Sequence, residues 1–378
     1  MGRRLIVLIV SVFFLSFTFT TVKRWGFFGH RLINRTAIYT LPLDLYRFYK
    51  NHIDYIEYHS VDPDKRRYAV EAEGKRHYID LDYWADSDRI LDKTLRDLIF
   101  EHAQITASRS DQRPVFINVE DVDSIKTQRI ESIYQRYKES WSEILNEDHI
   151  SFYIDDIKGD SVKVKITDRF TDHGILPFHI YYYYGLLERS FLNQNLEEIL
   201  RYSAEIGHYI SDAHVPLHTT MNYDGQLSGQ KGIHAFWESR IPELFAIQEY
   251  DLYVDKAQYI LDVKSFVRDI VINTHQLVDD VLEIEQELSQ SWPEDQKYCY
   301  DERGVNIVRM PCKEYAREYQ NRMKHMVERQ MRKSISAIGS IWYTAWENGG
   351  RPDMRKLYAN YEINRSDGSL DRHILRKN

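Results

Sequence analysis

Apolar residues spaced three and four positions apart dominate the chain, and this spacing predicts a mainly α-helical fold. Long helices are expected over 177–191, 196–213, 233–247, 254–288 and 314–346. Shorter helices are expected over 30–41, 43–52, 89–106 and 123–145. Pro42 separates the first two of these, because proline ends a helix. Together the segments predict a bundle-like helical domain.

One segment alternates apolar and polar residues instead. The sequence at 150–166, ISFYIDDIKGDSVKVKI, alternates on both sides of a turn at Lys158, Gly159 and Asp160. This pattern predicts a β-hairpin. After the last expected helix, the residues at 349–378 are mostly polar, and we interpret them as a C-terminal tail.

The first residues have the pattern of a secretory signal. Arg3 and Arg4 precede the apolar run LIVLIVSVFFLSFTF, and polar sequence follows to the end of the chain. An uncleaved membrane anchor is the alternative, but the run is shorter than the ~20 residues that a spanning helix needs. We therefore predict a signal peptide over 1–24 and a periplasmic or secreted protein.

Charge changes the expected partners. The formal net charge is −8, and residues 1–24 hold four basic and no acidic residues, so the remainder carries −12. An acidic exterior gives no counterion-release drive toward nucleic acid or anionic lipid. A phosphate-bearing substrate would then have to be held by bound metal.

The two cysteines, Cys299 and Cys312, bracket a turn-like segment, YDERGVNIVRMP. In an oxidising compartment they are expected to form a disulfide that closes a small loop. Two buried free thiols are the alternative.

Residues of metal-ligand type are concentrated between 208 and 238. This stretch contains His208, Asp212, His218, His234 and Glu238. Two of its pairs, HxxxD and HxxxE, have the i,i+4 spacing that places both donors on one face of a helix. One such pair is more often an ion pair, but the joint pattern indicates a metal site. Imidazole and carboxylate donors together favour zinc over calcium or magnesium.

Four motifs occur in a fixed order: WGFFGH at 25–30, Asp62 fifteen residues before His77 in RHYID, GHYISDAHVPLH at 207–218, and GIHAFWE at 232–238. In this order they resemble the superfamily that unites fungal and plant single-strand-specific zinc nucleases with bacterial zinc-dependent phospholipases C. The resemblance implies a single mainly helical domain over 25–348. The stretch at 109–170, with the hairpin, is longer than that family core requires, and we interpret it as an insertion.

The resemblance also implies three zinc ions. The first would be bound by Asp62, His77, His208 and Asp212, and the second by His218, His234 and Glu238. The third would be bound by His30, by Asp212 as a bridging carboxylate, and by the amino and carbonyl groups of Trp25. The zinc pair bridged by Asp212 would generate the hydroxide, so Asp212 is the expected catalytic residue.

Two further points concern this expected site. Trp25 would have to be the mature N-terminus, yet the preceding Val22, Lys23 and Arg24 are a poor match to a signal-peptidase site. Either a second protease trims after Arg24 or the third zinc lacks its amino ligand. Asp80 and His214 are expected to orient ligands by hydrogen bonding, with local backbone contacts as the alternative.

These observations predict a zinc-dependent hydrolase of phosphoric ester bonds. The WGxxGH start and the Asp62–His77 spacing are similar to the nuclease and 3'-nucleotidase branch, which we favour. Glu238 as last ligand and the short gap from His218 to His234 are similar to the phospholipase C branch. The expected substrate is single-stranded nucleic acid or phospholipid, with no stable protein partner. A non-catalytic zinc-binding protein and a membrane-anchored interaction protein are the alternatives of another class.

Overall fold

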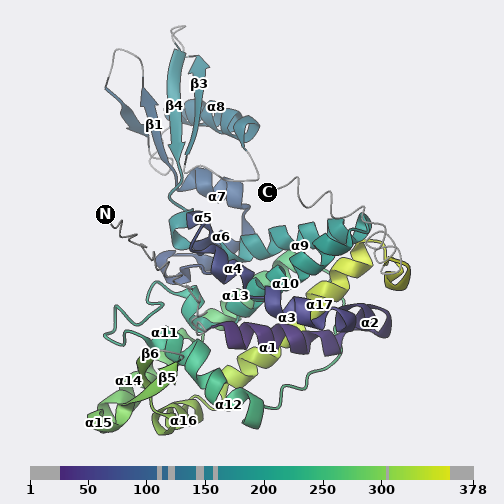
Figure 1. The fold of residues 1–378 in the computed structure, drawn as a ribbon. Helices are drawn as coiled ribbons and strands as arrows, with labels where there is room; N and C mark the ends of the chain where they lie inside the picture. Colours follow the sequence, from purple (N-terminus) through teal and green to yellow (C-terminus); the bar gives the residue numbers. More distant parts are fainter. Residues whose placement is uncertain are drawn as a thin grey trace, which may run out of the picture.

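The computed structural model describes residues 26–108, 113–117, 124–141, 149–155, 161–303 and 306–357. The fold is mainly α-helical with a few small antiparallel strands, which confirms the predicted class. A module of strands and one helix projects from a body of packed helices (Figure 1). The predicted signal peptide, Trp25 and residues 358–378 of the tail lie outside the described residues. Within the described ranges, no helix is long and apolar enough to span a membrane.

Three long helices form the centre of the body: α9 (Leu176–Leu192), α10 (Leu196–Asp212) and α17 (Met326–Asn348). Each packs against the other two, and α1 (Phe27–Ala37) packs across α10 and α17. Trp342 of α17 is fully buried and donates its indole N–H to the Ser203 carbonyl at 3.1 Å. The centre of the body is thus a continuous apolar core.

Shorter elements surround this centre. The helices near the N-terminus are α2 (Leu43–Asn51), α3 (Ile53–His59), α4 (Asp62–Arg66), α5 (Glu71–Gly74), α6 (Ser87–Asp92) and α7 (Leu95–Glu101). Those in the C-terminal half are α11 (Ile233–Ala235), α12 (Ile241–Glu249), α13 (Val263–His275), α14 (Val278–Ser291), α15 (Glu294–Lys297) and α16 (Lys313–Arg322). The break at Pro42 lies where the sequence predicts it.

The helix expected over 254–288 is wrong in its first part. Residues 250–262 instead form an extended segment, and the helix begins at Val263. Asp262 caps that helix by accepting a hydrogen bond from the Ser265 N–H. The backbone N–H groups of Gln258 and Ile260 donate to Ser340 Oγ and Thr344 Oγ1 of α17. Contacts with a distant helix therefore outweigh the local helical spacing.

Two other expected helices are each divided. The segment at 314–346 forms α16 and α17, separated by Lys324 and His325, which have left-handed φ angles of 52° and 58°. Histidine is found at left-handed φ angles more often than most residues, but lysine is not. The segment at 89–106 forms α6, α7 and then strand β1 (Gln104–Ser108). Thr94 starts α7 as its N-cap by accepting from the Asp97 N–H.

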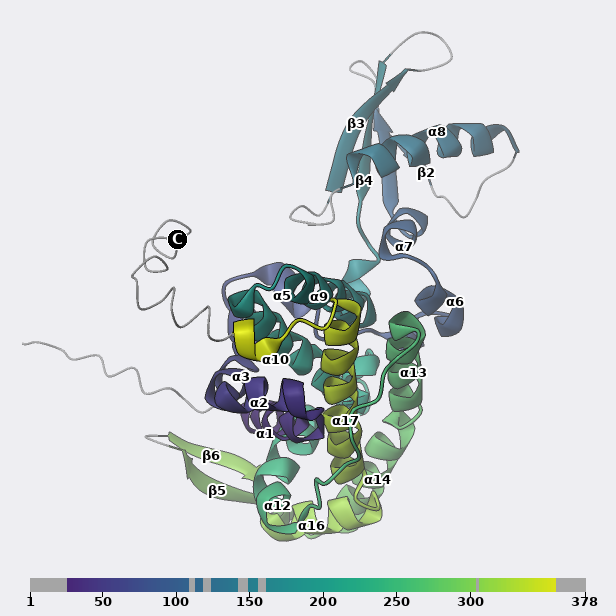
Figure 2. The ribbon, with the colours of Figure 1, turned by 90° about the vertical axis from the view of Figure 1, so that its right-hand side faces the viewer.

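The projecting module contains a four-stranded antiparallel sheet with the order β2-β1-β4-β3. Its other strands are β2 (Val115–Ile117), β3 (His149–Asp155) and β4 (Ser161–Thr167). β3 and β4 pair as Ile150↔Ile166, so the predicted hairpin is confirmed. Helix α8 (Ser124–Ser140) lies along one side of the sheet (Figure 2).

A second apolar core holds the module together. It includes Ile105 and Val164 of the sheet, Ile133 and Tyr137 of α8, and reaches back to Ile90 in α6. The module therefore includes residues before the expected insertion at 109–170. Ile90 of α6 and Leu98, Ile99 and Phe100 of α7 belong to this core, whereas Leu91 of α6 belongs to the core of the body.

The chain leaves and re-enters the body along one pair of extended segments. The Ile175 N–H donates to the Lys75 carbonyl at 2.8 Å, and the Asp80 N–H donates to the His173 carbonyl at 2.8 Å. Gly174 lies between them with φ 82°, and a Cβ there would be 2.1 Å from the Tyr78 carbonyl oxygen. Glycine is required at this crossing, since any side chain would push the two segments apart.

The predicted disulfide between Cys299 and Cys312 is confirmed. It joins the outer ends of a two-stranded hairpin, β5 (Tyr298–Arg303) and β6 (Asn306–Pro311). The buried Arg240 fixes this hairpin to the body through an ion pair with Asp301 at 2.8 Å and a hydrogen bond to the Pro311 carbonyl.

Replacing both cysteines by alanine is expected to lower the free energy of unfolding by about 2–3 kcal/mol. The cysteines are 13 residues apart, and closing a loop of that size removes entropy from the unfolded chain. Urea unfolding of the variant and of the reduced wild type measures the effect. Equal midpoints for oxidised and reduced wild type would contradict this prediction.

Candidate metal centre

Eight imidazole and carboxylate side chains converge within the helical body. Helix α10 contributes His208 and Asp212, one turn apart on its buried face. The other six come from short elements: His30 (α1), Asp64 (α4), His77 (after α5), His218 (a 3₁₀ turn, Pro216–Thr219), His234 (α11) and Glu238 (a π-helical turn, Phe236–Arg240). They form three groups in which the ligand atoms lie within 4.8 Å of one another.

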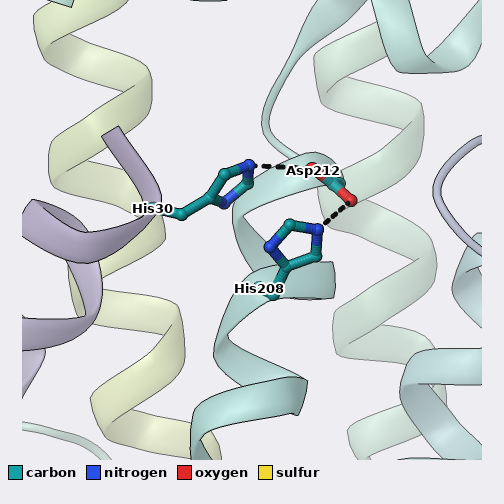
Figure 3. A group of neighbouring side chains, drawn as sticks. All are labelled: His30, His208 and Asp212. Atoms are coloured by element: carbon teal, nitrogen blue, oxygen red, sulfur yellow. Dashed lines mark ion pairs between the residues drawn. The ribbon is translucent and has the colours of Figure 1, made fainter. Parts of the chain in front are cut away.

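The first group consists of His30, His208 and Asp212 (Figure 3). The two oxygens of Asp212 point to different rings: Oδ1 lies 3.4 Å from His30 Nε2, and Oδ2 lies 3.3 Å from His208 Nε2. The two rings stack with their centroids 4.0 Å apart. All three side chains are almost completely buried.

The second group consists of Asp64, His77 and His208. Asp64 Oδ1 lies 3.8 Å from His208 Nε2 and 3.9 Å from His77 Nδ1. Asp212 also reaches this group, because its Oδ2 lies 2.9 Å from His77 Nδ1. His208 and Asp212 therefore connect the first two groups.

The third group consists of His218, His234 and Glu238. Glu238 Oε2 lies 2.9 Å from His234 Nε2 and 3.6 Å from His218 Nε2. Its other oxygen lies 3.2 Å from His30 Nε2, which joins this group to the first. Glu238 lies in a π-helical turn, a local widening of a helix that is frequent at functional sites.

The structure brings Asp64, and not Asp62, to His77 and His208. The Asp62 carboxylate points away from the group, to His59 Nδ1 at 2.5 Å and Lys65 Nζ at 2.6 Å. Residues two apart on a helix differ by about 200° in direction, so only one of the two can face the group. The spacing of fifteen residues before His77 selects Asp62, and nothing in the sequence distinguishes the two aspartates of VDPD.

Asp64→Asn is expected to lower the metal content of the purified protein by about one ion per chain. Asp62→Asn is the matched control, with the same chemical change two residues earlier, and its metal content should equal that of the wild type. Elemental analysis after dialysis against chelator and reloading measures both. Loss of metal from the Asp62 variant alone would restore the assignment made from sequence spacing.

The imidazoles are fixed from outside the groups. His208 Nδ1 donates to the Ser60 carbonyl at 2.9 Å, His218 Nδ1 to the His77 carbonyl at 2.5 Å, and His234 Nδ1 to the Tyr223 carbonyl at 3.1 Å. This arrangement leaves each Nε2 facing its group. Metal-binding histidines typically have such an outer hydrogen bond.

His218 provides the test of whether these residues suit a cation. Its Nε2 is buried without a hydrogen-bond partner and faces carboxylate oxygens of Glu238 at 3.6 Å and Asp212 at 4.0 Å. With Nδ1 donating outward, the Nε2 lone pair and two carboxylates point at one another. A positive charge between them is required, and the donor set suits a divalent metal ion.

The same crowding shifts pKa values. Burial alone would raise the pKa of Asp212, but the neighbouring His208 and His218 outweigh it and hold the pKa well below its usual range. Burial alone would lower the pKa of His218, but Asp212 and Glu238 raise it to about 9. The carboxylates are therefore ionised, and they favour a positive charge at His218, either a proton or a metal ion.

The hydrogen bonds of the two expected orienting residues go to groups other than the side chains of the three groups. The Asp80 carboxylate faces His173 Nδ1 at 3.3 Å, and burial raises its pKa to about 6. His214 donates to the Ile210 carbonyl, and burial lowers its pKa to about 4. Together with His30 and Glu238 it lines a cavity of about 30 Å³, which has room for about two waters.

Glu73 is a residue that the sequence does not single out. It is fully buried, and its Oε1 lies 3.7 Å from His77 Nε2, a buried nitrogen without a hydrogen-bond partner. Its carboxylate also accepts from Tyr209 Oη and from Arg76 at 2.6 Å. In sequence the segment EAEG is typical of an exposed turn, so only the fold reveals this role.

Trp25 lies outside the described residues, but the chain next to it approaches the groups. Gly26 lines the same cavity as His30 and Glu238, and a Cβ on Gly26 would be 3.6 Å from Glu238 Oε1. The segment that follows Trp25 therefore lies directly against the third group.

The chain matches no known protein-family model, and no curated protein sequence matches it.

Proposed function

We propose that this protein is a zinc-dependent phosphodiester hydrolase that acts on single-stranded nucleic acid. The observation that supports this most is the continuity of the three groups. Asp212 and His208 connect the first two, and Glu238 connects the first and third. Adjacent cation sites that share carboxylates suit a substrate whose oxygens develop negative charge at several positions.

Zinc is the ion that the donors favour. Five imidazoles and three carboxylates exclude an all-oxygen set of the kind that calcium and magnesium prefer. The third group provides three protein ligands, and three protein ligands with an open position are typical of catalytic zinc, whereas structural sites have four. This supports an enzyme over a zinc-binding protein without activity.

The chemistry follows from the shared carboxylates. Bound zinc would lower the pKa of water to about 7 and neutralise charge on phosphoryl oxygens. Asp212 would bind two neighbouring ions. The backbone carbonyls of Ser60 and His77, which accept from Nδ1 of His208 and His218, would keep the Nε2 atoms of these rings directed to the ions. In this proposal no separate side-chain base is needed.

A phospholipase C is the second candidate. The choice of nucleic acid rests on the WGFFGH start with His30. Glu238 as last ligand, and the short gap between His218 and His234, favour the phospholipase. The proposed place of action is outside the cytoplasm, which the Cys299–Cys312 disulfide supports.

The test is a substrate panel with protein of defined zinc content. Single-stranded DNA, RNA, 3'-nucleotides and phosphatidylcholine are each incubated with the loaded protein, with chelated protein and with chelated protein after zinc is returned. We expect cleavage of single-stranded nucleic acid that chelation abolishes and zinc restores. Hydrolysis of phosphatidylcholine alone would select the phospholipase, and hydrolysis of none by loaded protein would overturn the proposal.

The third zinc requires a separate measurement, the mass of the mature N-terminus. A chain that begins at Trp25 would place a free amino group beside Gly26, which lies against Glu238. A start at any other residue would count against an amino ligand from Trp25.

A further inference from the structure

The sheet of the projecting module has one covered face and one open face. Side chains alternate along each strand, and Ile105, Phe152 and Val164 point inward to the core with α8. The alternate residues, among them Thr106, Tyr153 and Lys163, belong to the other face. Figure 2 shows α8 on one side of the sheet, and no described element covers the other side.

The open face has two rows of side chains across the strands. In one row Phe116, Thr106, Lys165 and Ser151 are paired in register, and in the next row Ser108, Lys163 and Tyr153 are paired. Each row thus contains one lysine on the central strand β4 and one aromatic residue on an edge strand. We call these seven residues the open sheet face.

Both residue types on this face are free to bind. Phe116 is 67% and Tyr153 62% exposed, so both rings are accessible to a ligand. Both lysines are exposed, and no described side chain forms an ion pair with Lys163 or Lys165. No residue in the two rows is acidic, although the chain as a whole carries a net charge of −8.

We propose that the open sheet face binds single-stranded nucleic acid and delivers it to the metal centre. Lysines neutralise backbone phosphates, and exposed rings stack on bases with about 1–3 kcal/mol per base. Bases in a duplex are already stacked on one another, so this combination selects single strands. The inference extends the proposed function and rests on it in one respect, namely that the bound strand is then hydrolysed.

The alternatives fit this surface less well. A lipid surface would require contiguous apolar side chains, but polar Thr106, Ser108 and Ser151 and the two lysines separate the rings. Phe116 and Tyr153 lie on opposite edge strands, three strand spacings or about 14 Å apart. That separation suits an extended polymer that crosses the sheet.

The module joins the body close to the metal centre. Its two connections to the body run beside the segment that carries His77, through the hydrogen bonds of Ile175 to Lys75 and of Asp80 to His173. A strand held on the module would therefore raise the local concentration of cleavable bonds near the metal centre. The expected kinetic effect is on KM for long substrates, with kcat unchanged.

The experiment uses full-length protein stripped of metal, so that the probe is bound but not cut. Fluorescence anisotropy of labelled oligothymidylate is measured for wild type, for Lys163→Glu with Lys165→Glu, and for Phe116→Ala with Tyr153→Ala. The control pair is Lys313→Glu with Lys356→Glu, which has the same charge change on exposed lysines of the body.

We expect both face variants to bind at least about tenfold more weakly than wild type, a loss of about 1.4 kcal/mol. The lysine variant should also reduce the slope of log affinity against log salt by about 1.4, since each phosphate contact on a single strand contributes about 0.7. The control pair should match wild type. Equal binding by all variants, or tighter binding to phosphatidylglycerol vesicles than to the oligonucleotide, would overturn the inference.

Hydrolysis of bis(4-nitrophenyl) phosphate separates this inference from the proposed function. This small diester does not reach the open sheet face, so the face variants should cleave it like wild type. Cleavage with binding unaffected by the variants would remove the inference and keep the function. Binding that the variants abolish, without hydrolysis of any diester by zinc-loaded protein, would remove the function and keep the face as a binding site.

Discussion

Asp212→Asn is expected to lower phosphodiester hydrolysis by about 10³-fold and to remove at least one metal ion per chain. Asp212 is 1% exposed, and its two oxygens lie within 4.0 Å of the inner nitrogens of His30, His77, His208 and His218. Asparagine keeps the size but has no charge and only one oxygen. Metal ions at such sites contribute several kcal/mol, and about 4 kcal/mol corresponds to 10³ in rate.

The control is Asp280→Asn, the same change on an exposed part of α14. Rates on the small diester and metal content by elemental analysis are compared at equal zinc. Thermal unfolding of both metal-free variants shows whether the fold is kept. An Asp212 variant with full metal content and a rate within threefold of the wild type would mean that this carboxylate does not bridge two ions.

A bridging residue makes the three groups depend on one another. Asp212 is common to the first two groups, and Glu238 touches the rings of the first and third. Because each carboxylate serves two groups, removing one is expected to weaken ions on both sides. Variants of Asp64, which serves only the second group among the described residues, should lose a single ion.

Much of the fold could be predicted from residue spacing. The helices α9 and α10, the break at Pro42 and the hairpin of β3 and β4 depend on local patterns, and those predictions are confirmed. The extended segment at 250–262 could not be predicted, because Ser340 and Thr344 of a distant helix satisfy its backbone. The left-handed Lys324 likewise gives no local signal.

The candidate site also has one part that the sequence predicts and another part that only the fold determines. His208, Asp212, His234 and Glu238 are in i,i+4 pairs on helical turns, so the sequence alone brings each pair together. The choice between Asp62 and Asp64 depends on how the five residues of α4 are rotated, which only packing determines. No sequence pattern identifies Glu73. Its place beside the site depends on its contacts with Arg66, Arg76 and Tyr209, which only the fold brings together.

Glu73→Ala is expected to destabilise the protein by about 3 kcal/mol and to weaken zinc binding by about 10–100-fold. The fully buried carboxylate accepts from Arg76 at 2.6 Å, from Arg66 at 3.3 Å and from Tyr209 Oη. Its removal takes this partner from Arg76 and Tyr209, while Arg66 keeps Glu205 at 2.8 Å, and breaking a buried pair costs about 3–5 kcal/mol. The carboxylate also lies next to the outer nitrogen of His77, and outer partners of this kind contribute about 10–100-fold to metal affinity.

Urea unfolding of the metal-free protein measures the first effect, and competition with a zinc-binding dye measures the second. Glu73→Gln keeps the shape and one acceptor, so it should be intermediate in stability but still impaired in zinc affinity. Glu71→Ala, an exposed change in the same short helix, should alter neither by more than about 0.5 kcal/mol. If Glu73→Ala and Glu71→Ala unfold at the same urea concentration, the buried network does not stabilise the fold. If they bind zinc equally, Glu73 does not position His77.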